Sequence, residues 1–216
     1  ISKIDTLVIS HMDKDHFNAI PHLLRQTPIE RCVVADATVL LGRKWPGFER
    51  VLRDAGIRIE QCRTGTIFTP TTDTKVHVRF TGKELVQSND NARSTVLEIK
   101  IYDQSLLLTG DIEGDGLEML TRQPINRTTV LLAPHHGSLH SSPEKFAAWC
   151  RPGLTIASTG RYKIPTRVIT AYSANHQGLP SLLLSTHHHG CITVDFTPDG
   201  MKCMPLFPNG IDQSRR

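Results

Sequence analysis

Four side chains that can bind a metal ion lie close together near the start of the chain: His11, Asp13, Asp15 and His16. They follow a short apolar run over residues 6–9 and precede a stretch with apolar residues at helical spacing. A loop at the end of a strand can bring all four to one point, which helical spacing cannot do. Imidazole and carboxylate groups are common ligands of divalent ions, so this loop predicts a metal site. The alternative is a polar turn in which Asp13 or Asp15 caps the following helix.

Two other apolar runs end in residues of the same kind. Asp111 follows residues 105–108, and His135 with His136 follows residues 128–132. Alone, Asp111 could be a turn or capping residue, and the two histidines could belong to a surface loop. Together they supply one carboxylate between two groups of His and Asp. A bridging ligand of that kind holds two ions about 3.5–4 Å apart, so the sequence predicts a dinuclear centre.

Composition limits the class of protein. The chain has 216 residues, of which 38% are hydrophobic, and this is enough for one sizeable domain with a buried core. We find no apolar run of the roughly 18 residues that a membrane helix needs. Five cysteines, none in a C-x-x-C pair, argue against a disulfide framework or a cysteine-rich zinc site. The net charge of +4 permits an anionic partner. The chain starts at Ile1, almost directly with the first apolar run, which suggests a piece of a longer protein.

The order of expected elements predicts an α/β fold. Helical periodicity is found over residues 17–26, 41–55, 113–122, 142–150 and 166–175. Strands are expected over residues 6–9, 31–35, 57–62, 94–102, 105–109, 128–132, 154–157, 182–185 and 191–196, with alternating, antiparallel segments between 64 and 80. The histidine run 187–189 is expected to form a turn between strands. We expect one domain over residues 1–198 and a loosely ordered, Pro/Gly-rich tail over 199–216.

The three loops carry a family resemblance. The sequences S-H-x-D-x-D-H from Ser10, L-T-G-D from Leu108 and P-H-H-G-S from Pro134 resemble the motifs of the metallo-β-lactamase superfamily. More narrowly, the chain is similar to the C-terminal hydrolase domain of ComEC-type competence DNA-uptake proteins. That branch has Asp where most of the superfamily has its second His, as Asp13 does here. The resemblance implies an αββα sandwich that lacks its first N-terminal strands.

The resemblance also implies roles for the site residues. His11 and Asp13 would serve one ion, Asp15 and His16 the other, Asp111 would bridge them, and His136 would complete a shell. His135 is then expected to contact a substrate phosphate. Asp13 or Asp15 is also expected to orient the nucleophile.

Three regions of the chain depart from the family pattern. Relatives often have a metal-binding His before the hairpin, where this chain offers Ser94, Asn91 or water as a ligand. Lys163 stands in the loop where relatives often have an active-site His, so it is expected to supply the positive charge there. Asn18 and Ala19 replace two glycines, so the entry to the first helix is expected to differ.

The implied activity is metal-dependent phosphodiester hydrolysis, with DNA as substrate during uptake. Three carboxylates and few imidazoles make a hard site, which favours two ions of Mn²⁺, with Zn²⁺ as the alternative. One rival interpretation is a hydrolase of a small phosphodiester, ester or lactone on the same centre. Another is a non-catalytic domain that binds DNA or a partner protein. The resemblance further implies a bacterial inner-membrane parent protein, although these residues contain no membrane segment.

Overall fold

A computed structural model describes residues 2–35, 47–174, 178 and 180–210 of the chain. The first unit is a three-stranded parallel sheet in the order β1-β2-β3, with bounds Ile4–Val8, Ile29–Val34 and Arg58–Gln61. Parallel neighbours need a crossover connection, and here the connections contain helices. These helices are α1 (Lys14–Phe17), α2 (Ile20–Leu24) and α4 (Phe48–Asp54). Phe17, Ile20, Phe48 and Leu52 of these helices pack in one apolar cluster with Cys32 and Val34 of β2.

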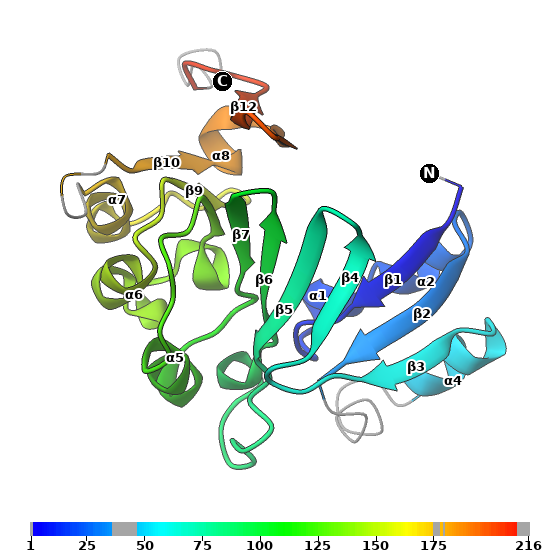
Figure 1. The fold of residues 1–216 in the computed structure, drawn as a ribbon. Helices are drawn as coiled ribbons and strands as arrows, with labels where there is room; N and C mark the ends of the chain where they lie inside the picture. The colour runs from blue at the N-terminus through cyan, green and yellow to red at the C-terminus, as the bar shows by residue number, and fades with distance from the viewer. Residues whose placement is uncertain (1, 36–46, 175–177, 179, 211–216) are drawn as a thin grey trace.

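The second unit is a seven-stranded mixed sheet in the order β10-β9-β8-β7-β6-β5-β4. Neighbours from β4 to β7 are antiparallel, and those from β7 to β10 are parallel. The strands are β4 (Ile67–Thr71), β5 (Thr74–Phe80), β6 (Val96–Ile101), β7 (Gln104–Leu108), β8 (Val130–Leu132), β9 (Leu154–Ala157) and β10 (Leu182–Ser185). Helices α5 (Gly114–Thr121), α6 (Pro143–Cys150) and α7 (Thr166–Ser173) cover one face of this sheet (Figure 1).

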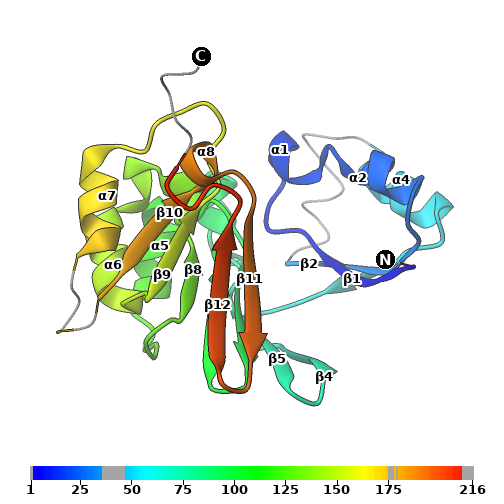
Figure 2. The same cartoon turned by 90° about the horizontal axis from the view of Figure 1, so that it is seen from above.

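The two sheets face each other through a shared apolar cluster. Val33 of β2 and Cys62, just after β3, are buried in it with Val78 of β5 and Leu97 of β6. The helices of each unit lie on the outer sides, so the layers run helix, sheet, sheet, helix (Figure 2). The α/β sandwich predicted from the sequence is therefore confirmed.

The C-terminal part differs from the prediction. Strands β11 (Ile192–Thr197) and β12 (Gly200–Pro205) form an antiparallel hairpin that packs against β8, β9 and β10. The expected loose tail is thus wrong for residues 200–205, because the apolar side chains Met201 and Cys203 join this cluster. Residues 187–189 form the one-turn helix α8 (Thr186–His189) rather than a simple turn.

The first helices are also shorter than expected. Instead of one helix over residues 17–26, α1 ends after Phe17 and α2 begins at Ile20, with Asn18 and Ala19 between them. Pro21 explains the break, because proline is tolerated in the first turn of a helix but not in its interior. Of the helix expected over 41–55, α4 accounts for residues 48–54, and residues 41–46 lie outside the described part. The other predicted helices and strands are confirmed to within a few residues where they are described.

Candidate metal centre

Three strand ends from both sheets meet at the site. The loop after β1 comes from the first sheet, and the loops after β7 and β8, which are parallel neighbours, come from the second. Backbone hydrogen bonds hold these loops: Thr95 N–H, just before β6, donates to the Ser10 carbonyl (2.7 Å), and His135 N–H donates to the Gly110 carbonyl (3.1 Å). Gly110 has φ +52°, and a Cβ there would lie 3.0 Å from Cβ of Ser10 and 3.1 Å from Oγ of Ser94. Only glycine fits this close approach without strain.

Asp111 is the centre of this arrangement. Its side chain is buried, with 5% of the residue exposed, and its backbone N–H donates to Ser94 Oγ at 3.1 Å. Four imidazole nitrogens surround its Oδ2 atom. The Nε2 atoms lie at 3.3 Å for His16, 3.7 Å for His136, 3.9 Å for His135 and 4.0 Å for His11. One buried carboxylate oxygen is therefore the common neighbour of all four histidines that the sequence singled out in the two loops.

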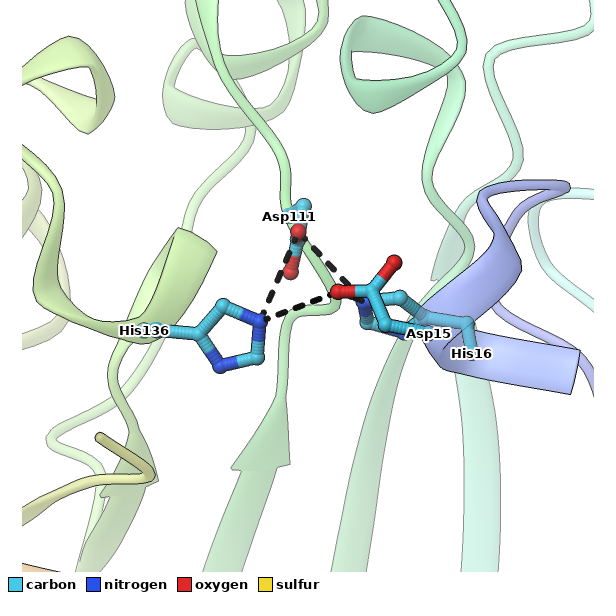
Figure 3. A group of neighbouring side chains, drawn as sticks. All are labelled: Asp15, His16, Asp111 and His136. Carbon is cyan, nitrogen blue, oxygen red and sulfur yellow. Dashed lines mark ion pairs between the residues drawn. The ribbon is translucent and has the colours of Figure 1, made fainter. Parts of the chain in front are cut away.

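Asp15, His16, Asp111 and His136 form a compact set (Figure 3). One ligand atom from each residue lies within 4.8 Å of the others, and Asp15 Oδ2 is 3.7 Å from His16 Nε2 and 3.8 Å from His136 Nε2. Two carboxylates and two imidazoles that converge in this way have the chemistry of a divalent-ion site.

The orphaned nitrogens of the first loop test this interpretation. His11 Nε2 and His16 Nε2 are buried and make no well-formed hydrogen bond among the described residues, although His16 Nε2 lies 3.3 Å from the Asp111 carboxylate. An unpaired buried polar atom costs about 1–3 kcal/mol, so such atoms call for an explanation. The Nδ1 atoms of both rings lie at hydrogen-bond distance from Ser10 Oγ, at 3.1 and 3.2 Å. A ring that donates from Nδ1 presents a lone pair at Nε2, and this fits a bound cation.

The charges of the site are strongly coupled. The Asp111 carboxylate raises the pKa of His16, against the opposing effect of burial. Burial lowers the pKa of His11, and the neighbouring His16 lowers it further. Burial acts to raise the pKa of Asp111, but the interaction with His16 and the charges of the other histidines outweigh it, so the net pKa is lowered. Asp111 is therefore held as a carboxylate, the form that binds cations.

The remaining predicted residues lie around this set. Asp13 is the N-cap residue of α1, and its Oδ2 is 3.6 Å from His11 Nε2. Ser94 is fully buried and its hydroxyl accepts the backbone N–H of Asp111, so Ser94 contacts the main chain of Asp111. The Asn91 amide lies 3.4 Å from Glu113. The roles of Asp13, Ser94 and Asn91 as ligands stay predictions.

Lys163 lines a groove beside the metal set. The groove has a volume of about 560 Å³, and His135, His136 and Tyr162 also line it. His135 and His136 have φ of +47° and +57°, a left-handed conformation that is uncommon for residues other than glycine. Such strain costs on the order of 1–3 kcal/mol for each residue and is concentrated at functional sites.

Sequence reasoning missed two residues that hold the histidines. Ser10 contacts both rings of the first loop, and Glu113 Oε2 lies 3.0 Å from His135 Nδ1. Ser10 stands within the first motif and Glu113 follows Asp111 by two positions. In the sequence, Ser10 and Glu113 could have been recognised only by their positions near the predicted metal ligands His11 and Asp111.

The chain belongs to the metallo-beta-lactamase superfamily, whose family model matches residues 1–151. ComE operon protein 3 of Bacillus subtilis is 30% identical over 82% of this chain and 23% of that protein. Recombination protein 2 of Haemophilus influenzae is 26% identical over 74% of this chain and 18% of that protein. The chain thus spans less than a quarter of the length of these two relatives. The metallo-beta-lactamase fold protein YhfI from Bacillus subtilis superposes with a TM-score of 0.54 at 11% identity, over 84% of this chain and 74% of that one.

These findings confirm the family and its fold, and they confirm the resemblance to competence proteins. The family and the candidate site together support a metal-binding hydrolase. Within the described residues, no helix has the length and apolar character needed to cross a membrane.

Proposed function

We propose that this domain is a divalent-metal-dependent phosphodiesterase that cleaves the DNA backbone, as one part of a longer DNA-uptake protein. The observation that carries the proposal is the position of Asp111. Its buried carboxylate lies within 4.0 Å of Nε2 of His11, His16, His135 and His136, and it joins Asp15 in the compact metal set.

One group of residues would bind the cations, and a second group, in the neighbouring groove, would bind the substrate. Asp15, His16, Asp111 and His136 would hold one divalent ion, and His11 with Asp13 would hold a second near Asp111. Mn²⁺ is the favoured metal because half of the compact set is carboxylate, and Zn²⁺ is the alternative. When bound, such ions supply a nucleophilic hydroxide at neutral pH and neutralise charge on the phosphate oxygens. Asp13 or Asp15, both at the rim of the site, would orient the attacking group.

The groove lined by His135 and His136 would bind the substrate. Lys163 lies in its wall with its ammonium group as a point charge for a phosphate oxygen. An enzyme that acts on backbone phosphates needs no base-reading motif, and the net charge of +4 favours a polyanion. The name of one relative, Recombination protein 2, supports DNA as the substrate class.

A matched substrate panel tests the proposal. The purified domain is incubated with single-stranded and duplex DNA and with bis(p-nitrophenyl) phosphate, each with Mn²⁺, with Zn²⁺ and with EDTA. We expect metal-dependent cleavage of DNA, and we expect Asp111→Ala to abolish both cleavage and metal binding. Asp115→Asn on helix α5 removes a carboxylate outside the metal set and serves as the control.

The other outcomes contradict specific parts of the proposal. If the small ester is hydrolysed and DNA is not cleaved, the proposed substrate class is wrong, but the metal centre is still supported. A domain that binds DNA but holds well below one ion per chain would instead be a non-catalytic binder. Equal cleavage by wild type and Asp111→Ala would remove the bridging carboxylate from the mechanism.

A further inference from the structure

Glu113 is the N-cap residue of α5 and has extended backbone angles, φ −151° and ψ 176°. This conformation carries its side chain to His135, whose Nδ1 lies 3.0 Å from Glu113 Oε2. The opposite ring nitrogen, His135 Nε2, lies 3.9 Å from Oδ2 of Asp111. His135 therefore stands between two carboxylates, one on each side of its ring.

A chain of hydrogen bonds fixes the direction of the Glu113 contact. The backbone N–H of Ala92 donates to Asn89 Oδ1 at 2.8 Å, and because a backbone N–H can only donate, the orientation of the Asn89 amide is set. Asn89 Nδ2 then donates to Glu113 Oε1 at 2.9 Å, with Asn91 Nδ2 at 3.4 Å from the same oxygen. A carboxylate only accepts, so His135 must donate from Nδ1.

Close backbone packing holds this chain in place. A Cβ on Gly116 of α5 would lie 1.8 Å from the carbonyl oxygen of Ala92, so the loop and the helix touch directly. The short 3₁₀ helix η1 (Asn91–Arg93) belongs to the same loop, which also bonds to α5 through Ser88 and Asp115 at 3.2 Å. Relatives often have a metal-binding histidine before the hairpin, and this chain has the loop with Asn89 there. The loop therefore contacts His135 indirectly, through Asn89 and Glu113.

We propose that Glu113 is a positioning residue of the metal centre, an inference that rests on the proposed function. It holds His135 as the Nδ1–H tautomer, with Asn89 orienting Glu113 in turn. His135 then presents its Nε2 lone pair toward Asp111 and serves as an additional metal ligand rather than as a phosphate contact. The arrangement of a carboxylate behind a ligating histidine fixes ring orientation and raises ligand basicity in metal sites generally.

The tautomer of His135 can be measured without any activity assay. Long-range ¹H–¹⁵N spectra of the metal-free protein at about pH 8, where histidines are mostly neutral, distinguish Nδ1–H from Nε2–H rings. We expect the Nδ1–H form for His135 in wild type and in Glu113→Gln, which keeps an acceptor oxygen. In Glu113→Ala we expect the Nε2–H form to become populated. The same spectra show whether each variant is folded.

Zinc binding by equilibrium dialysis gives the second measurement. Glu113→Ala is expected to weaken the affinity for at least one Zn²⁺ by about 10–100-fold, and Asn89→Ala by several-fold, since outer partners of ligands have effects of this size. Glu118→Gln, which removes a charge of α5 that pairs with Lys145, is expected to bind Zn²⁺ as wild type does.

Two results separate this inference from the proposed function. If Glu113→Ala keeps the Nδ1–H tautomer and the wild-type Zn²⁺ affinity while Asp111→Ala loses the metal, the centre stands and the role of Glu113 is wrong. If Asp111→Ala also binds Zn²⁺ normally, the metal centre itself is wrong.

Discussion

Asp111 Oδ2 and His16 Nε2 lie 3.3 Å apart, although the two residues come from loops on different sheets. Asp111 follows β7 of the seven-stranded sheet, and His16 lies in α1, directly after β1 of the other sheet. The contact is possible because Gly110 lets the two loops approach, with the Ser10 and Ser94 side chains close on either side. The pair therefore depends on the packing of the two sheets as much as on its own charges.

The His16–Asp111 pair predicts how the metal-free protein responds to pH. The pKa of His16 is raised, so its contribution to stability is present below its unfolded value of about 6.5 and is lost as pH rises through the folded pKa. The pKa of Asp111 is lowered, so its contribution is present above about 4 and is lost as pH falls.

Denaturant unfolding in EDTA measures the pH range in which the His16–Asp111 pair stabilises the metal-free protein. The difference in free energy of unfolding between wild type and Asp111→Asn is expected to be largest between about pH 4 and 6.5, and to shrink above that range. His11, whose pKa is lowered by burial, opposes stability on the acid side in both proteins. A difference that is constant from pH 5 to 9 would contradict the assigned coupling.

Ser10→Ala tests the shared hydroxyl behind two ligands. Ser10 Oγ lies 3.1 and 3.2 Å from Nδ1 of His11 and His16, so its loss frees both rings to turn. We expect Zn²⁺ affinity to fall by about 10–100-fold. Ser88→Ala, which removes a hydroxyl that bonds only to Asp115 among the contacts described, is the control. Unchanged affinity in Ser10→Ala would show that the hydroxyl does not orient the rings.

Gly116→Ala tests the packing of the loop on α5. Alanine is better than glycine in a helix by about 0.5–1 kcal/mol. At Gly116, however, the new Cβ would lie 1.8 Å from a carbonyl oxygen, and overpacking costs about 1–3 kcal/mol or more. We expect a net loss of stability in denaturant unfolding. Gly160→Ala, where nothing lies within 4 Å, is expected to be nearly neutral, and a stabilised Gly116→Ala would contradict the close contact.

Lys163→Ala tests the groove. If Lys163 binds one backbone phosphate, its loss is expected to weaken DNA binding by about tenfold and to reduce the salt slope of binding by about 1. Metal content should stay at the wild-type level. Lys202→Ala on the exposed side of β12 is the matched control. An equal loss of affinity in both variants would point to a general charge effect instead of a contact in the groove.

The fold was predictable wherever local pattern and long-range packing agree. The β6–β7 hairpin follows from strong alternation around a two-residue turn, and its register pairs Ile101 with Gln104 as a tight hairpin requires. Strand β12 was missed because prolines and glycines around it indicate a loop, while its apolar residues gain burial from strands that lie far away in the chain, β7 to β10, and from β11. Pro21 was the available signal for the break between α1 and α2.

The candidate site was predictable because its residues come in compact motifs at strand ends. Convergence on one Asp111 oxygen was not, since it depends on how the two sheets pack. Glu113 shows the same limit, because its partner Asn89 lies far away in the chain and only the close packing at Gly116 brings them together.

The metal set takes ligands from both halves of the sandwich, and this has a mechanical consequence. An ion held by His16 and His136 would act as a clamp between two layers that also meet through apolar contacts, backbone hydrogen bonds and the His16–Asp111 pair. Binding to the folded state alone stabilises a protein by RT ln(1 + [L]/Kd), about 2.7 kcal/mol at a hundredfold excess over Kd. Metal supply would then set how tightly the halves close, so chelation should open the molecule to proteases along the seam between the sheets.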